Sequence, residues 1–289
     1  MAAKMIVNAD DFGVSAEVNA AVVQARRKGV LTSASLMVTG ACYADAVDIA
    51  RRDPGLAVGL HLTLSNGASL LPPAEIPLIA DSKGRFIDSP ARAGLRYYFN
   101  GRAGNQLRKE IEAQFEAFAR TGLQLSHVDG HQHLHLHPTV FPLVLEFAKR
   151  YGARGMRIPC EPFWRGVGID SSKPAAKAAV AMGHAYLRSG VRRRLSETGL
   201  ATCERSIGSL MSGRMSAGYV IAMLRRLRCR SIEVFFHPSV ADSGGPLGPN
   251  RGDLDALLDP ALRSFIEASD YELTSYFGMR ERVSACGLD

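Results

Sequence analysis

The sequence has few cysteines, and no two of them have the spacing of a metal or redox motif. The five cysteines are Cys42, Cys160, Cys203, Cys229 and Cys286. Because none forms a C-x-x-C pair, the sequence favours neither a disulfide framework nor a thiolate zinc site. We therefore expect reduced thiols and a cytoplasmic protein.

Long apolar runs are absent as well. The N-terminal stretch MAAKMIVNADDFG reaches an acidic pair too early to contain the apolar core of a signal peptide. No uninterrupted apolar run approaches the roughly 20 residues that cross a bilayer. The chain also lacks G-x-G-x-x-G and P-loop patterns, and it has no aromatic clusters of the kind that stack on single-stranded bases. We expect no membrane-spanning helix and no nucleic-acid partner.

The composition is that of an ordinary globular protein. Of the 289 residues 46% are hydrophobic and 22% are charged, with a formal net charge of +7. This charge is compatible with an anionic partner such as phosphate or a membrane surface, although a solvated basic surface is the simpler interpretation. The length is sufficient for a substantial core, and we expect one domain over residues 1–289.

Short apolar segments alternate with longer amphipathic ones. Strands are expected at 4–11, 33–40, 56–64, 125–131, 155–159, 231–239 and 271–276. Helices are expected at 15–29, with Ser15 as N-cap and Gly29 just past the end, and at 43–55, 104–122 and 138–152. Regular interleaving of strands and helices indicates an α/β fold with a parallel sheet. A single (β/α) barrel of about seven parallel strands, complete or incomplete, is the simplest architecture, and an open doubly wound sheet is the alternative.

Chemically active side chains fall where these strands end. The carboxyl ends of parallel strands share one face, where barrel enzymes gather their catalytic groups, so we expect the catalytic face here. Agreement among five strands is hard to attribute to chance. The residues are Asp10 and Asp11, His61, Asp129 and His131, Arg157, and His237.

Two adjacent aspartates need an explanation beyond solubility. A lone aspartate is most simply a turn cap, and a lone His61 is most simply a hydrogen-bonded core histidine. Capping needs only one carboxylate, however, and the second then lies close to a like charge. A cation nearby would relieve the repulsion between Asp10 and Asp11.

The segment HVDGHQHLHLHP holds five of the eight histidines. In an extended segment their alternating spacing would send them to one face, and one or two of them could bind a metal while the others pack. One carboxylate with two imidazoles suits a divalent ion. One aspartate of the pair would then hold the ion and the other would act as general base. His237, from the opposite side of the barrel, is a candidate acid, and Arg157 would orient the base.

These residues together resemble the YdjC-like carbohydrate deacetylases, distant relatives of the NodB-type polysaccharide deacetylases. The matching stretches are VNADDFGVSAEVNAAV, GVLTSASLMVTG, VGLHLTL, HVDGHQHLHLHP, RIPCEP and FFHPS. The combination of NADDFG with DGHQHLH is specific, whereas either alone is much weaker. FFHPS departs from the more usual HPG ending, which puts the local turn in doubt.

The resemblance implies a distorted (β/α) barrel with magnesium or zinc as the ion. It implies that the ion is held by Asp11, His61 and His131, with His133 in the same motif as the alternative to His131. It also makes Asp10 the general base and His237 the acid.

The closer resemblance is to the hopanoid biosynthesis-associated branch of the family. It implies a hopanoid lipid with an N-acetylglucosamine headgroup as substrate, and a chitooligosaccharide is the alternative. The segment 177–195 adds a basic amphipathic pattern that could contact the inner membrane surface, with a solvated barrel helix as the plainer interpretation. Its apolar residues are Val180, Leu187, Val191 and Leu195, and its basic ones are Lys177, Arg188, Arg192, Arg193 and Arg194.

Two other functions remain open at this point. Two histidines and a carboxylate also form the site of non-heme iron oxygenases, although such chemistry does not need the second aspartate. A non-catalytic protein that binds an anionic surface is the other alternative. The oligomeric state is not indicated, and the loop from Asn66 to Gly104 is long enough to close over the site.

Overall fold

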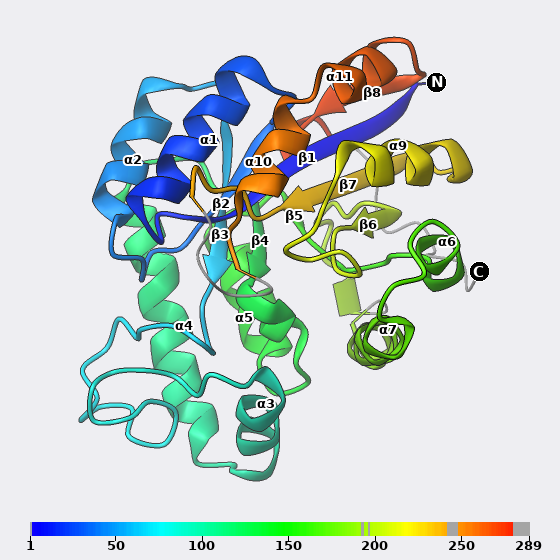
Figure 1. Ribbon diagram of the computed structural model, residues 1–289. Helices are drawn as coiled ribbons and strands as arrows, with labels where there is room; N and C mark the ends of the chain where they lie inside the picture. Colours follow the sequence, from blue (N-terminus) through cyan, green and yellow to red (C-terminus); the bar gives the residue numbers. More distant parts are fainter. Residues whose placement is uncertain (1, 192–193, 196, 242–247, 280–289) are drawn as a thin grey trace.

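Eight parallel strands form a sheet that curls through the centre of the molecule, with helices around it (Figure 1). The computed structural model describes residues 2–191, 194–195, 197–241 and 248–279. Seven strands follow the order β5-β4-β3-β2-β1-β7-β6, and β8 pairs with the first half of β1. The strands are β1 Ala3–Phe12, β2 Ser33–Leu36, β3 Ala57–Leu62, β4 His127–Gly130, β5 Gly155–Met156, β6 Arg205–Ile207, β7 Ser231–Phe236 and β8 Tyr271–Thr274.

This arrangement confirms the predicted α/β fold with its curled, barrel-like parallel sheet. The two end strands are not joined by a continuous ladder, but one bridge between Gly155 and Ala201 links β5 to the segment that leads into β6. The curl therefore gathers the carboxyl ends of the strands around a common centre, which a flat doubly wound sheet would not do. β1 lies in the middle of the sheet and is buried along nearly its whole length, which explains its continuous apolar run.

Helices cover the outside of the sheet (Figure 1). They are α1 Ala16–Lys28, α2 Tyr43–Arg52, α3 Pro90–Phe99, α4 Ala103–Arg120, α5 Phe141–Arg150, α6 Phe163–Val167, α7 Pro174–Ser189, α9 Ala217–Arg226, α10 Arg251–Leu258 and α11 Pro260–Glu267, with short 3₁₀ turns η1 His131–Leu136 and η2 Tyr276–Gly278. The first helix begins as predicted, because the Ser15 hydroxyl accepts a hydrogen bond from the Val18 amide at 3.3 Å and Gly29 follows the last turn.

The long connection from Asn66 to Gly104 is anchored to the body of the molecule. It contains α3, and its side chains Ile76, Ile79 and Phe86 belong to the apolar core. The buried carboxylate of Glu110 on α4 accepts hydrogen bonds from the backbone amides of Leu70 and Leu71, which fixes the first part of the connection. The connection is thus built into the fold.

Two expectations about the surface and the thiols need correction. Cys160 is disulfide-bonded although it lies in no C-x-x-C motif, whereas the thiols of Cys42 and Cys229 are free. In the basic segment 177–195, Lys177 is buried and paired with Asp170 at 3.3 Å, and Val191 and Leu195 belong to the core. Arg192 and Arg193 lie outside the described residues. No helix within the described part of the chain is long and apolar enough to span a membrane.

Candidate active site

A cavity of about 790 Å³ opens at the carboxyl ends of the strands, and it brings the predicted residues together. β1 contributes Asp10 and Asp11, β3 contributes His61, and the turn after β4 contributes His131. His237 follows β7 directly and also lines the cavity. The sixth predicted residue, Arg157, lies just after β5 and is completely buried beside Asp10.

The backbone of Asp11 explains how two adjacent carboxylates reach one cavity. In a regular strand consecutive side chains point to opposite faces, so Asp10 and Asp11 would be separated by the sheet. The pairing of β1 with β2 instead shifts register between Ala9 and Phe12, and Asp11 has φ of 61°. Aspartate tolerates this left-handed conformation better than most residues, and such strain gathers at functional sites. The irregularity turns both carboxylates toward the cavity.

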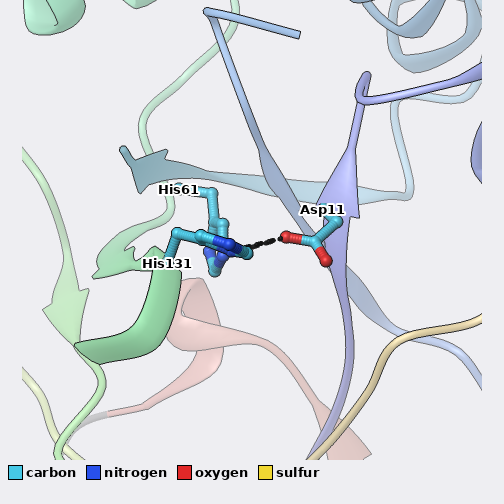
Figure 2. A group of neighbouring side chains, drawn as sticks. All are labelled: Asp11, His61 and His131. Atoms are coloured by element: carbon cyan, nitrogen blue, oxygen red, sulfur yellow. Dashed lines mark hydrogen bonds and ion pairs between the residues drawn. The ribbon is translucent and has the colours of Figure 1, made fainter. Parts of the chain in front are cut away.

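Asp11, His61 and His131 form a compact group, shown in Figure 2. Asp11 Oδ1 lies 3.1 Å from His131 Nδ1 and 3.4 Å from His61 Nε2. The ligand atoms of the three side chains all lie within 4.8 Å of one another. His61 Nε2 is buried and has no hydrogen-bond partner among the described residues. This donor set fits a divalent cation, because it offers one carboxylate and two imidazole nitrogens around a common point.

Electrostatics hold Asp11 ready as an anion. Burial disfavours its carboxylate, but His131 and His61 outweigh that effect and keep the pKa of Asp11 well below its usual range. The same geometry therefore favours a cation beside Asp11, whether an imidazolium or a metal ion.

Asp129, at the end of β4, fixes the orientation of His61. Its Oδ1 lies 2.8 Å from His61 Nδ1, so His61 donates through Nδ1 and leaves Nε2 facing Asp11. The other oxygen of Asp129 accepts a hydrogen bond from the Ser35 hydroxyl at 2.7 Å and forms an ion pair with Arg157 Nη1 at 2.9 Å. Asp10, His61 and Asp129 form a second possible metal group, but both oxygens of Asp129 are already engaged. A carboxylate behind a ligating imidazole is a common arrangement in metal sites.

Arg157 holds Asp10 by two hydrogen bonds. Its Nη1 lies 2.6 Å from Asp10 Oδ2, and its Nη2 lies 2.8 Å from Asp10 Oδ1. The amide of Asn8 donates a third hydrogen bond to Asp10 at 2.8 Å. Burial disfavours the guanidinium charge, but Asp10, Asp129 and Glu233 outweigh it and raise the pKa of Arg157 well above its usual value. Asp10 is thereby fixed in position at the edge of the cavity.

Glu233 and Tyr276 belong to the hydrogen-bond network around Arg157. Neither residue was predicted from the sequence. The Glu233 carboxylate accepts hydrogen bonds from Arg157 Nε at 3.0 Å and from the Tyr276 hydroxyl at 2.9 Å. Burial raises the pKa of Glu233 to about 7, although Arg157 opposes this shift. A single acidic residue inside the apolar run IEVFF was the available signal for Glu233. Nothing in the sequence around Tyr276 indicated its role.

His237 enters the cavity from the strand next to Asp10. β7 is hydrogen-bonded to β1, so the expectation that His237 comes from the opposite side of the barrel was wrong. Its Nε2 lies 3.7 Å from Asp10 Oδ2. The buried carboxylate of Asp253 accepts hydrogen bonds from the backbone amides of His237 at 2.8 Å and Met215 at 3.0 Å. These bonds fix the turn after β7.

The histidine-rich segment is not extended, as its alternating pattern had suggested. After β4 the chain forms η1, in which Gln132 and His133 have φ of 55° and 57°. This turn sends His131 to Asp11, whereas His133 packs against His184 of α7 with ring centroids 4.8 Å apart. His135 is buried and bonds to the backbone carbonyl of Arg157 at 2.9 Å. The histidines therefore diverge, and His131 is the one beside Asp11 and His61.

A family model and two relatives of known name resemble this chain. The family model described as YdjC-like protein matches residues 4–268. A carbohydrate deacetylase of Brevibacillus brevis is 39% identical over 56% of this chain, which spans 60% of that protein's length. A chitooligosaccharide deacetylase of Enterobacter sp. (strain 638) is 28% identical over 95% of this chain and 98% of its own.

A solved structure shows the same fold. The crystal structure of an Enterococcus faecalis V583 protein, described as a candidate for cellobiose-phosphate cleavage, superposes with a TM-score of 0.72. The alignment covers 96% of this chain and 98% of that chain, at 22% identity. This likeness concerns the fold alone.

Proposed function

Because this chain belongs to the YdjC-like protein family, we propose that it is a metal-dependent carbohydrate N-deacetylase. The reaction is hydrolysis of the acetamido group of an N-acetylglucosamine unit to acetate and a free amine. The observation that carries the proposal is the meeting, in one cavity, of the group Asp11, His61 and His131 with a second carboxylate, Asp10. The names of the Brevibacillus and Enterobacter relatives support the reaction class.

In this proposal Asp11, His61 and His131 hold a divalent ion, magnesium or zinc. Such an ion polarises a carbonyl oxygen and makes water more acidic. Asp129 keeps His61 in the tautomer that presents Nε2 to the ion, because it accepts a hydrogen bond from Nδ1–H at 2.8 Å.

Asp10 and His237 carry the proton transfers. Asp10 takes a proton from the water that attacks the acetyl carbonyl carbon, and Arg157 positions its carboxylate for this step. The C–N bond then breaks, and His237 donates a proton to the departing amine. The distance of 3.7 Å between His237 Nε2 and Asp10 Oδ2 supports an acid and a base that act on the same amide.

The finer proposal is that the sugar is the headgroup of a hopanoid lipid. Two helices that contribute to the cavity wall, α3 through Pro90 and α7 through Val180 and His184, also carry large apolar side chains exposed to solvent. These are Leu95, Tyr98 and Phe99 on α3 and Met182 and Tyr186 on α7. An exposed apolar surface on two helices that reach the cavity suits an amphiphilic substrate. With Lys177 buried, this surface supports the lipid proposal better than the basic residues do.

Acetate release from two substrates tests both levels of the proposal. Purified protein with added zinc or magnesium would be given an N-acetylglucosamine-headed hopanoid in detergent and N,N′-diacetylchitobiose, with Asp10→Asn run in parallel. Acetate release from the lipid alone supports the hopanoid substrate. Acetate release from the disaccharide alone supports the deacetylase reaction and excludes the hopanoid substrate. If neither substrate releases acetate although metal is bound, and the protein consumes oxygen in the presence of iron, the oxygenase alternative would replace the deacetylase.

A further inference from the structure

Helix α7 has its polar and apolar faces in the reverse of the usual arrangement. A surface helix normally turns its apolar stripe to the core and its charged residues to water. Within α7, all of which the structure describes, Lys177 is the only buried residue, and its ammonium is paired with Asp170 at 3.3 Å. On the same side of the helix, His184 lines the cavity and Arg188 donates to the backbone carbonyl of Pro159 at 3.1 Å. These polar side chains therefore face the protein.

The opposite face of α7 is apolar and exposed to solvent. Residues spaced four, three and four positions apart form one stripe along the helix: Ala175, Ala179, Met182 and Tyr186. All four are exposed, Met182 by 67% and Tyr186 by 64%. A helix with its charges turned inward and an apolar stripe turned outward is suited to a partner that is less polar than water.

Helix α3 presents a second apolar face to solvent. Leu95 and Tyr98 are more than half exposed, and Phe99 is 77% exposed. The other side of the helix is anchored, because the buried Tyr97 donates its hydroxyl to the backbone carbonyl of Leu64 at 2.7 Å. The anchor fixes the exposed side chains on the outside. Aromatic and aliphatic side chains of this kind are typical of helices that lie in a lipid interface.

Both helices reach the cavity. Pro90 at the start of α3 and Val180 in the middle of α7 line it. In Figure 1 both helices lie in the lower part of the view, away from α1 and α11. A surface that contacts both helices would therefore lie next to the cavity.

Basic side chains accompany the apolar face of α3. Arg92 and Arg96 are exposed on the helix, and the exposed Arg102 follows it. Both helices lie wholly within the described residues, and neither contains an acidic residue. One exposed carboxylate, Asp88, precedes α3 and is outnumbered by these arginines. Anionic lipid headgroups attract such a surface, whereas a second copy of a chain with a net charge of +7 would bring like charges together.

We propose that the outer faces of α3 and α7 form a docking surface for an anionic lipid bilayer. The apolar side chains enter the interface of one leaflet, and the arginines of α3 contact the headgroups. This inference goes beyond the proposed deacetylase reaction and does not depend on it. Combined with that reaction, it places the cavity beside the headgroups of a membrane.

Flotation with lipid vesicles tests the proposal on the whole chain. Vesicles of phosphatidylcholine mixed with phosphatidylglycerol should bind the protein, and vesicles of phosphatidylcholine alone should bind at least about fivefold less. Binding to the mixed vesicles should weaken as salt is added, because salt screens the attraction between arginines and headgroups. Absence of binding to the mixed vesicles at low salt would overturn the proposal.

Two double substitutions test each helix by itself. Leu95→Ser with Phe99→Ser on α3, and Met182→Ser with Tyr186→Ser on α7, shorten exposed side chains outside the proposed catalytic groups. Each pair should lower partitioning into mixed vesicles at least about tenfold and leave the unfolding temperature unchanged. Leu273→Ser is the matched control, because β8 lies beside the amino-terminal half of β1 and Leu273 is exposed there. Unchanged partitioning in either double variant, or an equal loss in the control, would contradict the proposal.

The arginines have a test of their own. Arg92→Gln with Arg96→Gln should lower partitioning into mixed vesicles at least about fivefold and leave the weak binding to phosphatidylcholine vesicles unchanged. Arg52→Gln with Arg120→Gln, exposed at the ends of α2 and α4, removes the same charge from outside the docking surface. An equal loss in both pairs would show that net charge alone attracts the vesicles, and the arginines of α3 would lose their role.

A second copy of the chain is the other possible occupant of this surface. Light scattering over a range of protein concentrations decides between the two. If the chain self-associates and either double serine variant abolishes the association, the surface is a subunit interface and the proposal is wrong. A monomer, or an oligomer that these variants leave intact, agrees with the proposal. Vesicle binding without acetate release from any substrate would remove the deacetylase function and leave the docking surface in place.

Discussion

Arg157 donates two hydrogen bonds to Asp10, at 2.6 and 2.8 Å, from a position with no exposure to solvent. The same guanidinium reaches Asp129 and Glu233, so one cation links three carboxylates. Asp129 in turn orients His61. The residue proposed as base and a residue proposed as metal ligand are therefore held by one buried network, and changes to this network have separable consequences.

Arg157→Lys should impair turnover more than metal binding. A lysine ammonium keeps the charge but cannot make the two parallel bonds to Asp10 while also reaching Glu233. We expect kcat to fall about 10- to 100-fold, with bound metal retained, because misplacing a reacting group by about 1 Å can cost about 100-fold. Steady-state kinetics with metal analysis on the same preparation check this, and loss of metal together with activity would contradict it.

Asp129→Asn should weaken metal binding. The oxygen of an amide at this position can still accept a hydrogen bond from His61 Nδ1–H, but the amide can also present its NH₂ group and stabilise the wrong tautomer. Loss of such a carboxylate typically lowers metal affinity by about 10- to 100-fold. Competition with a chelator of known affinity measures the change, with Asp48→Asn, an exposed site on α2, as control. An unchanged affinity would remove Asp129 from its proposed role.

His237→Gln should affect the chemical step alone. The side chain is proposed as the proton donor to the amine and is not among the three proposed metal ligands, so metal content should stay at the wild-type level. We expect kcat to fall roughly 10²- to 10⁴-fold, as is usual for loss of a general acid. A substrate with a good leaving group needs less protonation, so its hydrolysis should suffer less. An equal loss on both substrates would argue against the acid role.

Stability should fall on acidification because of His127. Burial lowers the pKa of His127 to about 4, while the unfolded chain keeps the ordinary value near 6.5. Between these two values the unfolded state binds a proton that the folded state does not, so stability decreases as pH falls from about 6.5 to 4, by up to about 3 kcal/mol. Urea unfolding from pH 7.5 to 4.5 should show a shallower decline for His127→Gln. An identical slope in both proteins would contradict this.

Much of the framework could be predicted from the sequence. The first strand and the helix after it were predicted because continuous apolar runs, the Ser15 cap and Gly29 are local signals. Placing side chains at the ends of parallel strands was enough to bring Asp10, Asp11, His61, His131, Arg157 and His237 to one place.

What the sequence could not indicate depends on tertiary contacts and on local strain. The left-handed turn at Gln132 and His133 overrides the alternating pattern of the histidines, so their extended geometry was predicted wrongly. Lys177 is polar in sequence, yet its side chain is buried and pairs with the partly exposed Asp170. Glu233 reaches Arg157, and Tyr276 reaches Glu233, only because the fold brings β7 and the segment after β8 together.

The division of labour between the two adjacent aspartates is the central claim, and one paired measurement tests it most directly. Asp10→Asn and Asp11→Asn would be freed of metal and titrated with zinc, with the bound metal and the rate of acetate release from N,N′-diacetylchitobiose determined on each. The account predicts that Asp10→Asn binds zinc close to wild-type affinity without turnover, whereas Asp11→Asn loses both. Equal loss of zinc in the two variants, or full turnover by Asp10→Asn, would contradict it.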